Sequence, residues 1–423
     1  MISDIDDNRF ISPMLLWESY NDTYSQFTIP YVADANHDAG DSVVVRSSFM
    51  NQPFYHVLTQ PVSQGDTVEV QDIFTSRLFI GIEDEVYMSL NSSDFAQEPS
   101  WYLISSRLTN GVDGFVQSMA ASTDGNYLWV GTTEGKLYRI SGIAFAYDEE
   151  HADVNSTDCV IATVEVMIGE ENTQAVTSIA VDPSDNNKVL ITLGNMGNTD
   201  YVWFCQNGTA DMPEFTSVQG NLPAAPAYSC LLEMDPVTDV ALVGTELGLF
   251  ATDDITSGEW YVSGEEIGQV PVMAIKQQTL WKNRFVITIT DPVTGEKFYE
   301  IFPEPENYKD IYVATYGRGV FKYDTDAVGI EERPAGSKQD LSIQIYPNPA
   351  SNRAVVSVNM TQSGPVVVEM YDLSGRLAAT TQAELSAGMQ SIDLNLGTLP
   401  KGTYLVRVIA GNMTGNSKLV ILK

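Results

Sequence analysis

The stretch NYLWVGTTEGKLYRI, residues 126–140, decides the fold because the chain repeats it. Similar stretches are DVALVGTELGLFATD at residues 239–253 and DIYVATYGRGVFKYD at residues 310–324. In each, an apolar run ends in Val-Gly-Thr or Val-Ala-Thr, a short turn containing glycine follows, and a second apolar run begins. This pattern predicts antiparallel strands joined by tight hairpins.

Two further strands accompany each copy. An apolar strand precedes the repeat, and an aromatic-led strand comes before that one. The preceding strands begin at Val116, Val176, Tyr228 and Pro271, and the aromatic-led strands begin at Trp101, Phe215 and Trp260. A period of roughly 50 to 60 residues with about four strands per copy is typical of β-propeller blades. An array of β-sandwiches is the alternative.

Weaker hairpins at Arg77 and Lys188 fill gaps in the series. We count four full or nearly full copies and one partial copy. The last copy lacks an outermost strand, so we expect residues 1–75 or blades upstream to supply a closing strand. Small residues follow valine in the repeats, at Gly131, Gly244 and Ala314. We expect them to leave room for the adjoining sheet, since blades stack face to face.

Two phrases of the repeats resemble known propellers. DGNYLWVGTTEG resembles the two-component-regulator type of repeat, and VATYGRGVF resembles the last-blade phrase of sortilin-like propellers. Both phrases are short and are shared by proteins of many functions, so they imply the blade and little more.

Residues 341–423 show a different pattern. Apolar residues alternate through Leu341, Ile343 and Ile345 and again through later runs, each bounded by Pro, Gly or Asn. Short half-buried strands of this kind, within roughly 80 residues, predict a small immunoglobulin-like β-sandwich. The predicted fold class is therefore all-β, with β-propeller blades followed by a sandwich. We expect a strand-rich N-terminal segment at 1–75, repeats at 76–327, a linker at 328–340 and the sandwich at 341–423.

Three motifs in the sandwich, IYPNP, YDLSGR and KGTYLVRV followed by SKLVILK, resemble the C-terminal sorting domain of type IX secretion cargo. The resemblance implies delivery to the outside of the cell or its surface, by way of the periplasm, with the type IX translocon and its sorting or attachment machinery as partners. The residues that carry the resemblance are Tyr346, Pro347, Asn348, Pro349, Tyr371, Asp372, Ser374, Gly375, Arg376, Gly402, Tyr404, Lys418 and Lys423.

Charge divides the chain in the same place. The 423 residues carry a formal net charge of −34. Residues 341–423 hold six basic and four acidic residues, a net of +2, so the preceding part carries −36. Such an acidic surface excludes nucleic acid as a partner of the N-terminal part.

The sequence shows no run of apolar residues long enough to cross a membrane. Its start, MISDIDDNRF, lacks the features of a secretory signal. Because sorting-domain cargo needs such a signal, we expect this chain to be the C-terminal part of a longer precursor. Three scattered cysteines, Cys159, Cys205 and Cys230, predict no disulfide framework and are best interpreted as buried apolar thiols.

The loop DANHDAGD is the one candidate metal site. Asp34, Asn36, Asp38 and Asp41 offer alternating oxygen atoms, and calcium takes six to eight oxygen ligands. Ala39 stands where an EF-hand-like loop needs glycine, and no bidentate glutamate follows at the expected distance. An acidic hairpin turn without a cofactor is therefore the favoured interpretation, with calcium the alternative.

No catalytic residue is predicted. Asp124, Asp182, Asp235 and Asp291 follow blade strands, where aspartate stabilises turns through its own backbone. No nucleophile, zinc or phosphate-loop motif is found. The sequence favours a secreted or surface β-propeller that binds a protein or glycan. The alternatives are a propeller glycoside hydrolase or lyase with part of its site upstream, and a component of the secretion or attachment machinery.

Overall fold

The computed structural model describes residues 12–49, 51–93, 98–108, 114–169, 172–234, 240–264, 266–290, 297–323, 341, 343–360, 363–371, 377–397, 399–410 and 413–422. These residues form two compact units. Unit 1 holds residues 1–280 and 307–328, and unit 2 holds residues 281–306 and 329–423. Almost all regular structure is strand, as the sequence predicts; the helices described are α1 (Glu149–Ala152), η2 (Ile143–Phe145) and η3 (Ile255–Ser257).

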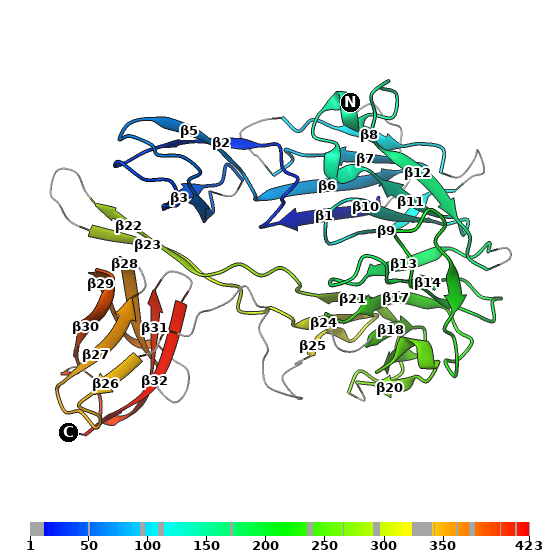
Figure 1. Ribbon diagram of the computed structural model, residues 1–423. Helices are drawn as coiled ribbons and strands as arrows, with labels where there is room; N and C mark the ends of the chain where they lie inside the picture. Colours follow the sequence, from blue (N-terminus) through cyan, green and yellow to red (C-terminus); the bar gives the residue numbers. More distant parts are fainter. Residues whose placement is uncertain are drawn as a thin grey trace. The chain divides into compact units, whose positions relative to one another are not determined.

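Unit 1 is a series of antiparallel sheets that follow one another in chain order (Figure 1). Four sheets have four strands each and a fifth has three. Their strands are β1 (Met14–Ser19), β6 (Thr75–Ile82), β7 (Glu85–Ser89) and β8 (Tyr102–Ser105); β9 (Val116–Ala121), β10 (Tyr127–Thr132), β11 (Leu137–Ser141) and β12 (Ala162–Val166); β13 (Val176–Val181), β14 (Val189–Leu193), β15 (Val202–Cys205) and β16 (Phe215–Ser217); β17 (Ala227–Leu232), β18 (Ala241–Thr245), β19 (Gly248–Thr252) and β20 (Tyr261–Ser263); and β21 (Val272–Gln277), β24 (Ile311–Thr315) and β25 (Gly319–Tyr323).

These sheets are β-propeller blades. Each is a meander whose first strand packs beside the first strand of the next sheet, and the apolar clusters lie between neighbouring sheets. The predicted repeat hairpins are confirmed as β10–β11, β18–β19 and β24–β25. The N-terminal strand β1 pairs with β6 and so supplies the first strand of the first sheet.

Glycine allows the sheets to approach one another closely. A Cβ atom built on Gly131 would lie 2.6 Å from Val176 Cβ, so no larger residue fits without a shift of the next sheet. The predicted role of Gly131 and Gly244 is thereby confirmed. The contact recurs between three pairs of sheets, as Gly81 with Val116, Gly131 with Val176 and Gly244 with Val272.

In the third sheet, a threonine takes the position that glycine has in the first, second and fourth sheets, and the next sheet begins with a smaller residue. Register places Thr192 opposite Ser178, as Gly131 lies opposite Ser118. The fourth sheet then begins with Ala227, where β9, β13 and β21 begin with valine. A larger residue on one sheet is thus matched by a smaller one on the next, as close packing requires.

Hydroxyl groups reinforce the same contact. On β9, β13 and β17, one side chain near the start of the strand donates a hydrogen bond to the carbonyl oxygen of the first residue of the next inner strand. These bonds are Ser118 Oγ to Val176 O at 2.7 Å, Thr177 Oγ1 to Ala227 O at 2.7 Å and Ser229 Oγ to Val272 O at 3.2 Å. They satisfy buried polar groups where neighbouring blades meet.

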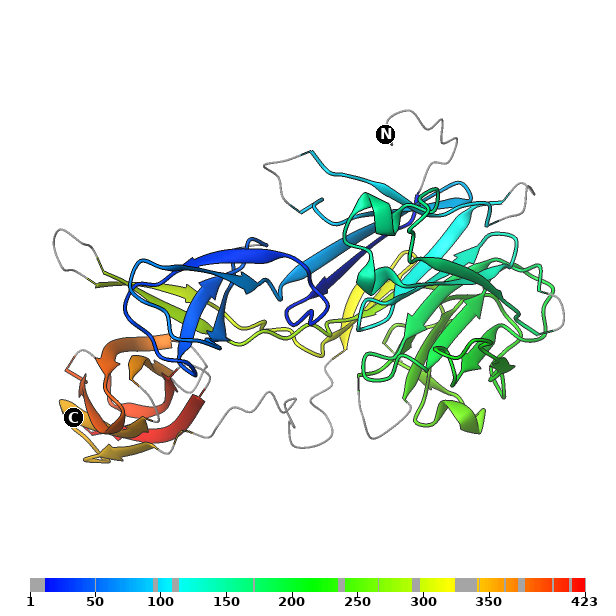
Figure 2. The same cartoon turned by 45° about the horizontal axis from the view of Figure 1, so that its top comes forward.

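A separate module is inserted between β1 and β6 (Figure 2). It contains two pairs of strands, β2 (Thr28–Val32) with β5 (Thr67–Gln71) and β3 (Ser42–Arg46) with β4 (Pro53–Val57). Its own small core includes Val43, Val45, Phe54 and Val70. The first blade is therefore interrupted by a β module that folds around its own apolar residues.

Unit 2 contains the predicted β-sandwich. One sheet has the order β26-β27-β30 and the other β29-β28-β31-β32, and their inner faces share one apolar core. The strands are β26 (Ile343–Tyr346), β27 (Arg353–Met360), β28 (Gly364–Tyr371), β29 (Leu377–Leu385), β30 (Gly388–Asn395), β31 (Gly402–Ala410) and β32 (Met413–Ile421). Unit 2 also includes a hairpin, β22 (Phe285–Thr290) with β23 (Lys297–Phe302), that lies between β21 and β24 in the chain.

The sequence predicts that all three cysteines are buried thiols, and this is confirmed for two of them. Cys205 and Cys230 are buried, Cys159 is half-buried, and all three are free thiols. Burial raises the pKa of Cys230 to about 11 and also raises the pKa of Cys205, so neither is a reactive thiolate at neutral pH.

Replacing Gly131 with alanine tests the contact between blades. The added Cβ would overlap Val176, and overpacking of this kind costs about 1–3 kcal/mol. We expect Gly131→Ala to lower the midpoint of urea unfolding. The matched control is Gly364→Ala, where a Cβ meets nothing within 4 Å and no loss is expected. Equal midpoints for the two variants would contradict the close-packing account.

Candidate ligand pocket and sorting surface

A cavity of about 430 Å³ lies between the inserted module and the first blade. Small-molecule sites commonly have volumes of about 300–1,000 Å³. Aromatic rings and hydroxyl groups make up most of the lining. The lining residues are Phe27, Ser48, Phe49, Phe74, Thr75, Ser76, Leu90, Asn91, Ser93, Ser100, Tyr102 and Tyr147.

Two buried aspartates fix the connections between the module and the blade. Asp22 follows β1, Asp72 precedes β6, and both are almost fully buried. Asp72 Oδ2 accepts hydrogen bonds from Ser48 N at 2.9 Å and Ser48 Oγ at 2.8 Å. Asp72 Oδ1 accepts one from Phe74 N at 3.1 Å. These bonds hold two lining residues, Ser48 and Phe74, at the connection that leads into β6.

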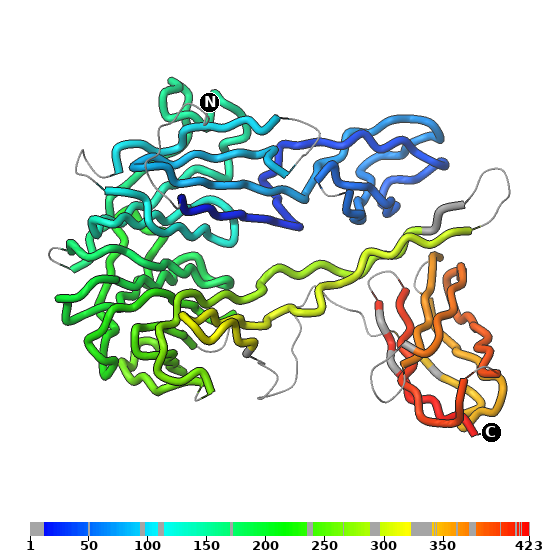
Figure 3. The backbone as a smooth tube through the Cα atoms, turned by 180° about the vertical axis from the view of Figure 1, so that it is seen from behind, coloured from blue at the N-terminus to red at the C-terminus, as the bar shows by residue number. Residues whose placement is uncertain are grey.

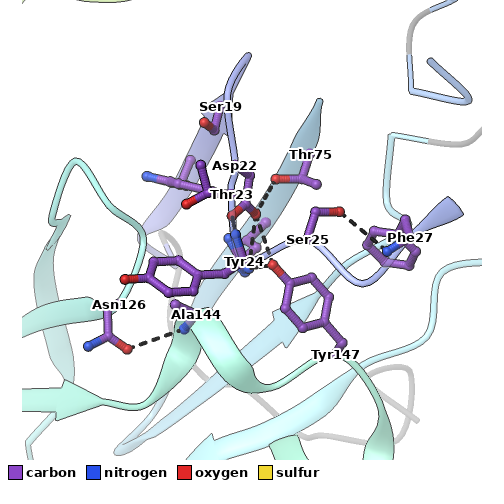
Figure 4. Close-up of polar contacts among 12 residues, drawn as sticks. Ser19, Asp22, Thr23, Tyr24, Ser25, Phe27, Thr75, Asn126, Ala144 and Tyr147 are labelled. Carbon is purple, nitrogen blue, oxygen red and sulfur yellow. Dashed lines mark hydrogen bonds and ion pairs between the residues drawn. The ribbon is translucent and has the colours of Figure 1, made fainter. Parts of the chain in front are cut away.

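Asp22 organises the other connection (Figure 4). Its Oδ2 accepts hydrogen bonds from Thr75 Oγ1 at 2.7 Å and from the Tyr147 hydroxyl at 2.9 Å. Arg77 Nη2 lies 3.4 Å from the same oxygen and donates to the Tyr147 hydroxyl at 2.7 Å. Two pocket residues, Thr75 and Tyr147, are thus held by one buried carboxylate.

Arg77 is an unusual buried cation. Its side chain is 1% exposed and lies over the rings of Trp17 and Tyr147, with its Cζ atom 4.6 and 5.1 Å from their centroids. Cation–π contacts of this kind are strongest when desolvated. Its Nε and Nη1 atoms have no hydrogen-bond partner among the residues described. Asp22 and the two aromatic rings therefore stabilise the positive charge of Arg77.

The titratable groups in the lining are tyrosines that stay neutral. Burial, and then the Asp22 carboxylate, raise the pKa of Tyr147, although Arg77 opposes this. Burial, with Glu149 and Asp148 nearby, also raises the pKa of Tyr102. Both phenols therefore remain protonated at neutral pH and can donate hydrogen bonds.

Asn91 holds the loop at the rim. Its Oδ1 accepts a hydrogen bond from Ser100 N at 2.8 Å, and its Nδ2 donates to Glu98 O at 3.3 Å. Phe27 packs edge-on against Tyr147, with centroids 5.5 Å apart. Among the described lining residues, side chains are aromatic, hydroxyl-bearing, aliphatic or amide, and none is a carboxylate or a cation.

The sorting motifs meet in space. Asn348 Nδ2 donates to Lys418 O at 2.6 Å, and Asn348 Oδ1 accepts from Val420 N at 2.9 Å. Residues 346–349 are exposed, as is Lys418. The first and last motifs therefore form one surface, in which the asparagine side chain pairs with β32 as a backbone would.

The middle motif is only partly described. Tyr371 donates to Glu369 Oε2 at 2.9 Å, whereas Asp372, Ser374, Gly375 and Arg376 lie outside the described residues. Lys423 also lies outside them. In the third motif, Tyr404 is buried and donates to Pro400 O at 2.9 Å, and Gly402 begins β31. Recognition of these residues by the secretion machinery stays a prediction.

The loop predicted to be an acidic turn or a calcium site is tied by its own hydrogen bonds. Asp34 Oδ1 lies 3.0 Å from His37 Nε2, Asn36 Oδ1 accepts from the Gln64 backbone, and Asp41 Oδ2 accepts from Asp38 N at 2.9 Å. His37 and Tyr31 lower the pKa of Asp34. Within the described part of the chain, no three His, Cys, Asp or Glu residues are grouped to hold a metal. Calcium binding here stays a prediction.

The predicted structural role of the turn aspartates is confirmed where it can be seen. Asp124 Oδ1 accepts from Asn126 N at 3.0 Å, and Asp182 Oδ1 accepts from Ser184 N at 2.7 Å. Asp235 and Asp291 lie outside the described residues. Among the residues that the structure describes, no helix is both long enough and apolar enough to cross a bilayer.

The pocket itself was not predicted. Its residues come from stretches of residues 27–49, 74–102 and 147, which share no repeat. The signal that could have found it is Phe-rich sequence around Phe27, Phe49 and Phe74 in a segment without blade periodicity.

Comparison with known proteins identifies the C-terminal part of the chain. Residues 344–422 match the family model for the secretion system C-terminal sorting domain. This domain implies export by the type IX secretion system, to the outside of the cell or its surface. Comparison with curated proteins gave no match. The resemblance of the repeats to regulator-type and sortilin-like propellers stays a prediction.

Similar solved structures include propeller proteins at low identity. The Swd1 (Cps50) β-propeller domain of Myceliophteria thermophila is 9% identical with a TM-score of 0.33, and the match covers 65% of this chain and 99% of that one. Sqt1 of Chaetomium thermophilum, bound to the N-terminus of a ribosomal protein, is 12% identical with a TM-score of 0.37, covering 75% of each chain. A mitotic checkpoint complex chain is 10% identical with a TM-score of 0.35, covering 94% and 95%. Nothing about function follows from similarity at this level.

Substitution of Arg77 tests the network behind the pocket. Removing one member of a buried ion pair leaves the other charge uncompensated and costs about 3–5 kcal/mol. We expect Arg77→Met to lower the free energy of unfolding by roughly this amount, measured by urea denaturation, and the double variant Asp22→Asn with Arg77→Met to recover much of the loss.

The matched control is Lys136→Met. Lys136 pairs with Glu165 at 2.7 Å, but the two side chains are 43% and 34% exposed. Exposed pairs contribute at most about 1 kcal/mol. If Arg77→Met destabilised no more than Lys136→Met, the Asp22–Arg77 pair could not be what holds the junction together.

Proposed function

We propose that the protein is a secreted or cell-surface β-propeller that binds a neutral glycan in the cavity between its inserted module and its first blade. The observation that carries this proposal is the composition of the lining: five aromatic rings, five hydroxyl side chains and one amide around about 430 Å³. Sugar rings present apolar C–H faces that pack on aromatic rings, and hydroxyl groups that need hydrogen-bond partners. Both kinds of partner are present together.

Charge supports a neutral ligand. The chain carries a net charge of −34, and among the described lining residues no cation is available to hold a phosphate, sulfate or carboxylate. An anionic ligand would approach against the field of the whole protein and find no counter-charge. A neutral sugar meets neither obstacle.

The lining also favours binding over hydrolysis. Glycoside hydrolases use two carboxyl groups on opposite sides of the scissile bond. The carboxylates bound to lining residues are already engaged: Asp22 Oδ2 accepts hydrogen bonds from Thr75 and Tyr147, and Asp72 Oδ2 accepts them from Ser48. A recognition role is therefore proposed, with export by the type IX system delivering it to where extracellular glycans are found.

A glycan array with neutral and acidic oligosaccharides, followed by calorimetry, tests the proposal. We expect neutral glycans alone to bind, and Phe49→Ala or Tyr102→Ala to weaken the affinity by roughly tenfold or more, because each removes a ring from the lining. The matched control is Tyr316→Ala, which removes a tyrosine that is 74% exposed and lies outside the lining.

Three outcomes would contradict the proposal. One is the absence of any glycan that binds. Another is an equal loss of affinity in Tyr316→Ala and the pocket variants. The third is the appearance of shortened sugars during the titration, which would favour a hydrolase.

A further inference from the structure

The hairpin β22–β23 belongs to unit 2, although the chain reaches it from β21 and leaves it toward β24 of the fifth blade. It lies beside the sorting domain, and β22 contacts β28 (Figure 3). Two ion pairs join the hairpin segment to the sandwich. Arg284 Nη1 lies 2.6 Å from Glu369 Oε1, and Arg407 Nη2 lies 2.6 Å from Glu304 Oε1.

The four charges form one network. Glu369 and Arg407 are direct partners across β28 and β31, so each hairpin charge meets an opposite charge on adjacent strands. The side chains are only 5–21% exposed. Charge pairs that are this well shielded from water are screened by salt less than surface pairs are.

The surface that the hairpin meets is not part of the sandwich core. Val366, Val368 and Met370 of β28 face the core, so Val367 and Glu369 face the other way. Both are nevertheless buried, at 1% and 3% exposure. A buried glutamate on the outward face of a sheet must be paired with a positive charge. Arg284 of the hairpin segment supplies that charge to Glu369.

We propose that this hairpin is a built-in binding site for the sorting domain. The sorting domain is attached to the rest of the chain twice, covalently through residues 328–340 and non-covalently through the hairpin. The occupant of the outward face of β28 and β31 is thus a segment of the same chain. When the covalent connection is cut, the sorting domain remains bound to the hairpin, and a competing partner releases it.

Cleavage of full-length protein tests this directly. A site for a specific protease is placed within residues 328–340, the protein is cut, and the two fragments are followed by size-exclusion chromatography at low salt and at 1 M NaCl, roughly the condition at which the Debye length falls to 3 Å. We expect the fragments to elute together at low salt and, because the ion pairs are shielded from water, to remain largely together at high salt.

Hairpin variants identify the contact without altering the sorting domain. Arg284→Glu and Glu304→Arg each place like charges together, and we expect each to weaken retention by roughly tenfold or more. The matched control is Arg353→Glu, because Arg353 and its partner Asp393 are 71% and 62% exposed.

The proposal is overturned if the parent fragments separate at low salt as soon as the chain is cut. It is equally overturned if retention is unchanged in both hairpin variants, or if Arg353→Glu weakens it as much as they do. Thermal unfolding of each uncut variant shows that the sorting domain is still folded, so a loss of retention is not mistaken for a loss of structure.

Discussion

The close contact between one blade and the next is the constraint on which unit 1 depends. Gly131 and Val176 show it most clearly, because a Cβ on the glycine would overlap the valine of the following sheet. A hydroxyl on each of three inner strands then donates to the first carbonyl of the next inner strand. Steric fit and hydrogen bonding thus act at the same place, and they set the spacing at which apolar side chains fill the space between sheets.

The candidate pocket depends on that spacing indirectly. The inserted module is joined to the first blade where the chain leaves β1 and enters β6, so the position of the module depends on the rigidity of that blade. Trp17 of β1 donates a hydrogen bond from Nε1 to Ser122 O of the second blade at 3.1 Å. The guanidinium of Arg77 lies over the ring of the same tryptophan. The packing between blades is in this way connected, through Trp17 and Arg77, to Asp22 and the tyrosine that lines the cavity.

The repeats could be predicted because each blade obeys local rules. Strand, glycine turn and strand recur in the sequence, and so do the residues that pack between sheets, so the hairpins and the roles of Gly131 and Gly244 followed from pattern alone. The sorting domain could be predicted because three motifs lie in order within one short module. The structure adds that Asn348 joins the first of these motifs to the last through hydrogen bonds to β32.

The pocket and the hairpin contact could not be predicted, since both are made by residues far apart in sequence. Asp22 and Tyr147 are 125 positions apart, and Arg407 and Glu304 are 103 apart. Neither pair belongs to a repeat, and an aspartate beside a hydrophobic stretch is usually a turn residue. The role of each carboxylate depends on its burial, because a buried carboxylate must be paired with hydrogen-bond donors or a cation. Only the folded chain shows which residues are those partners.

The account assigns recognition to the blades with their inserted module, and delivery to residues 341–423. Cell fractionation tests this division most directly. The chain is expressed behind a cleavable secretory leader in a host with a type IX system, with and without residues 341–423, and its location and its glycan binding are measured. The account predicts that the truncated protein stays in the periplasm and still binds glycan, whereas the intact protein reaches the surface or medium. Surface display of the truncated protein at the level of the intact one would contradict it.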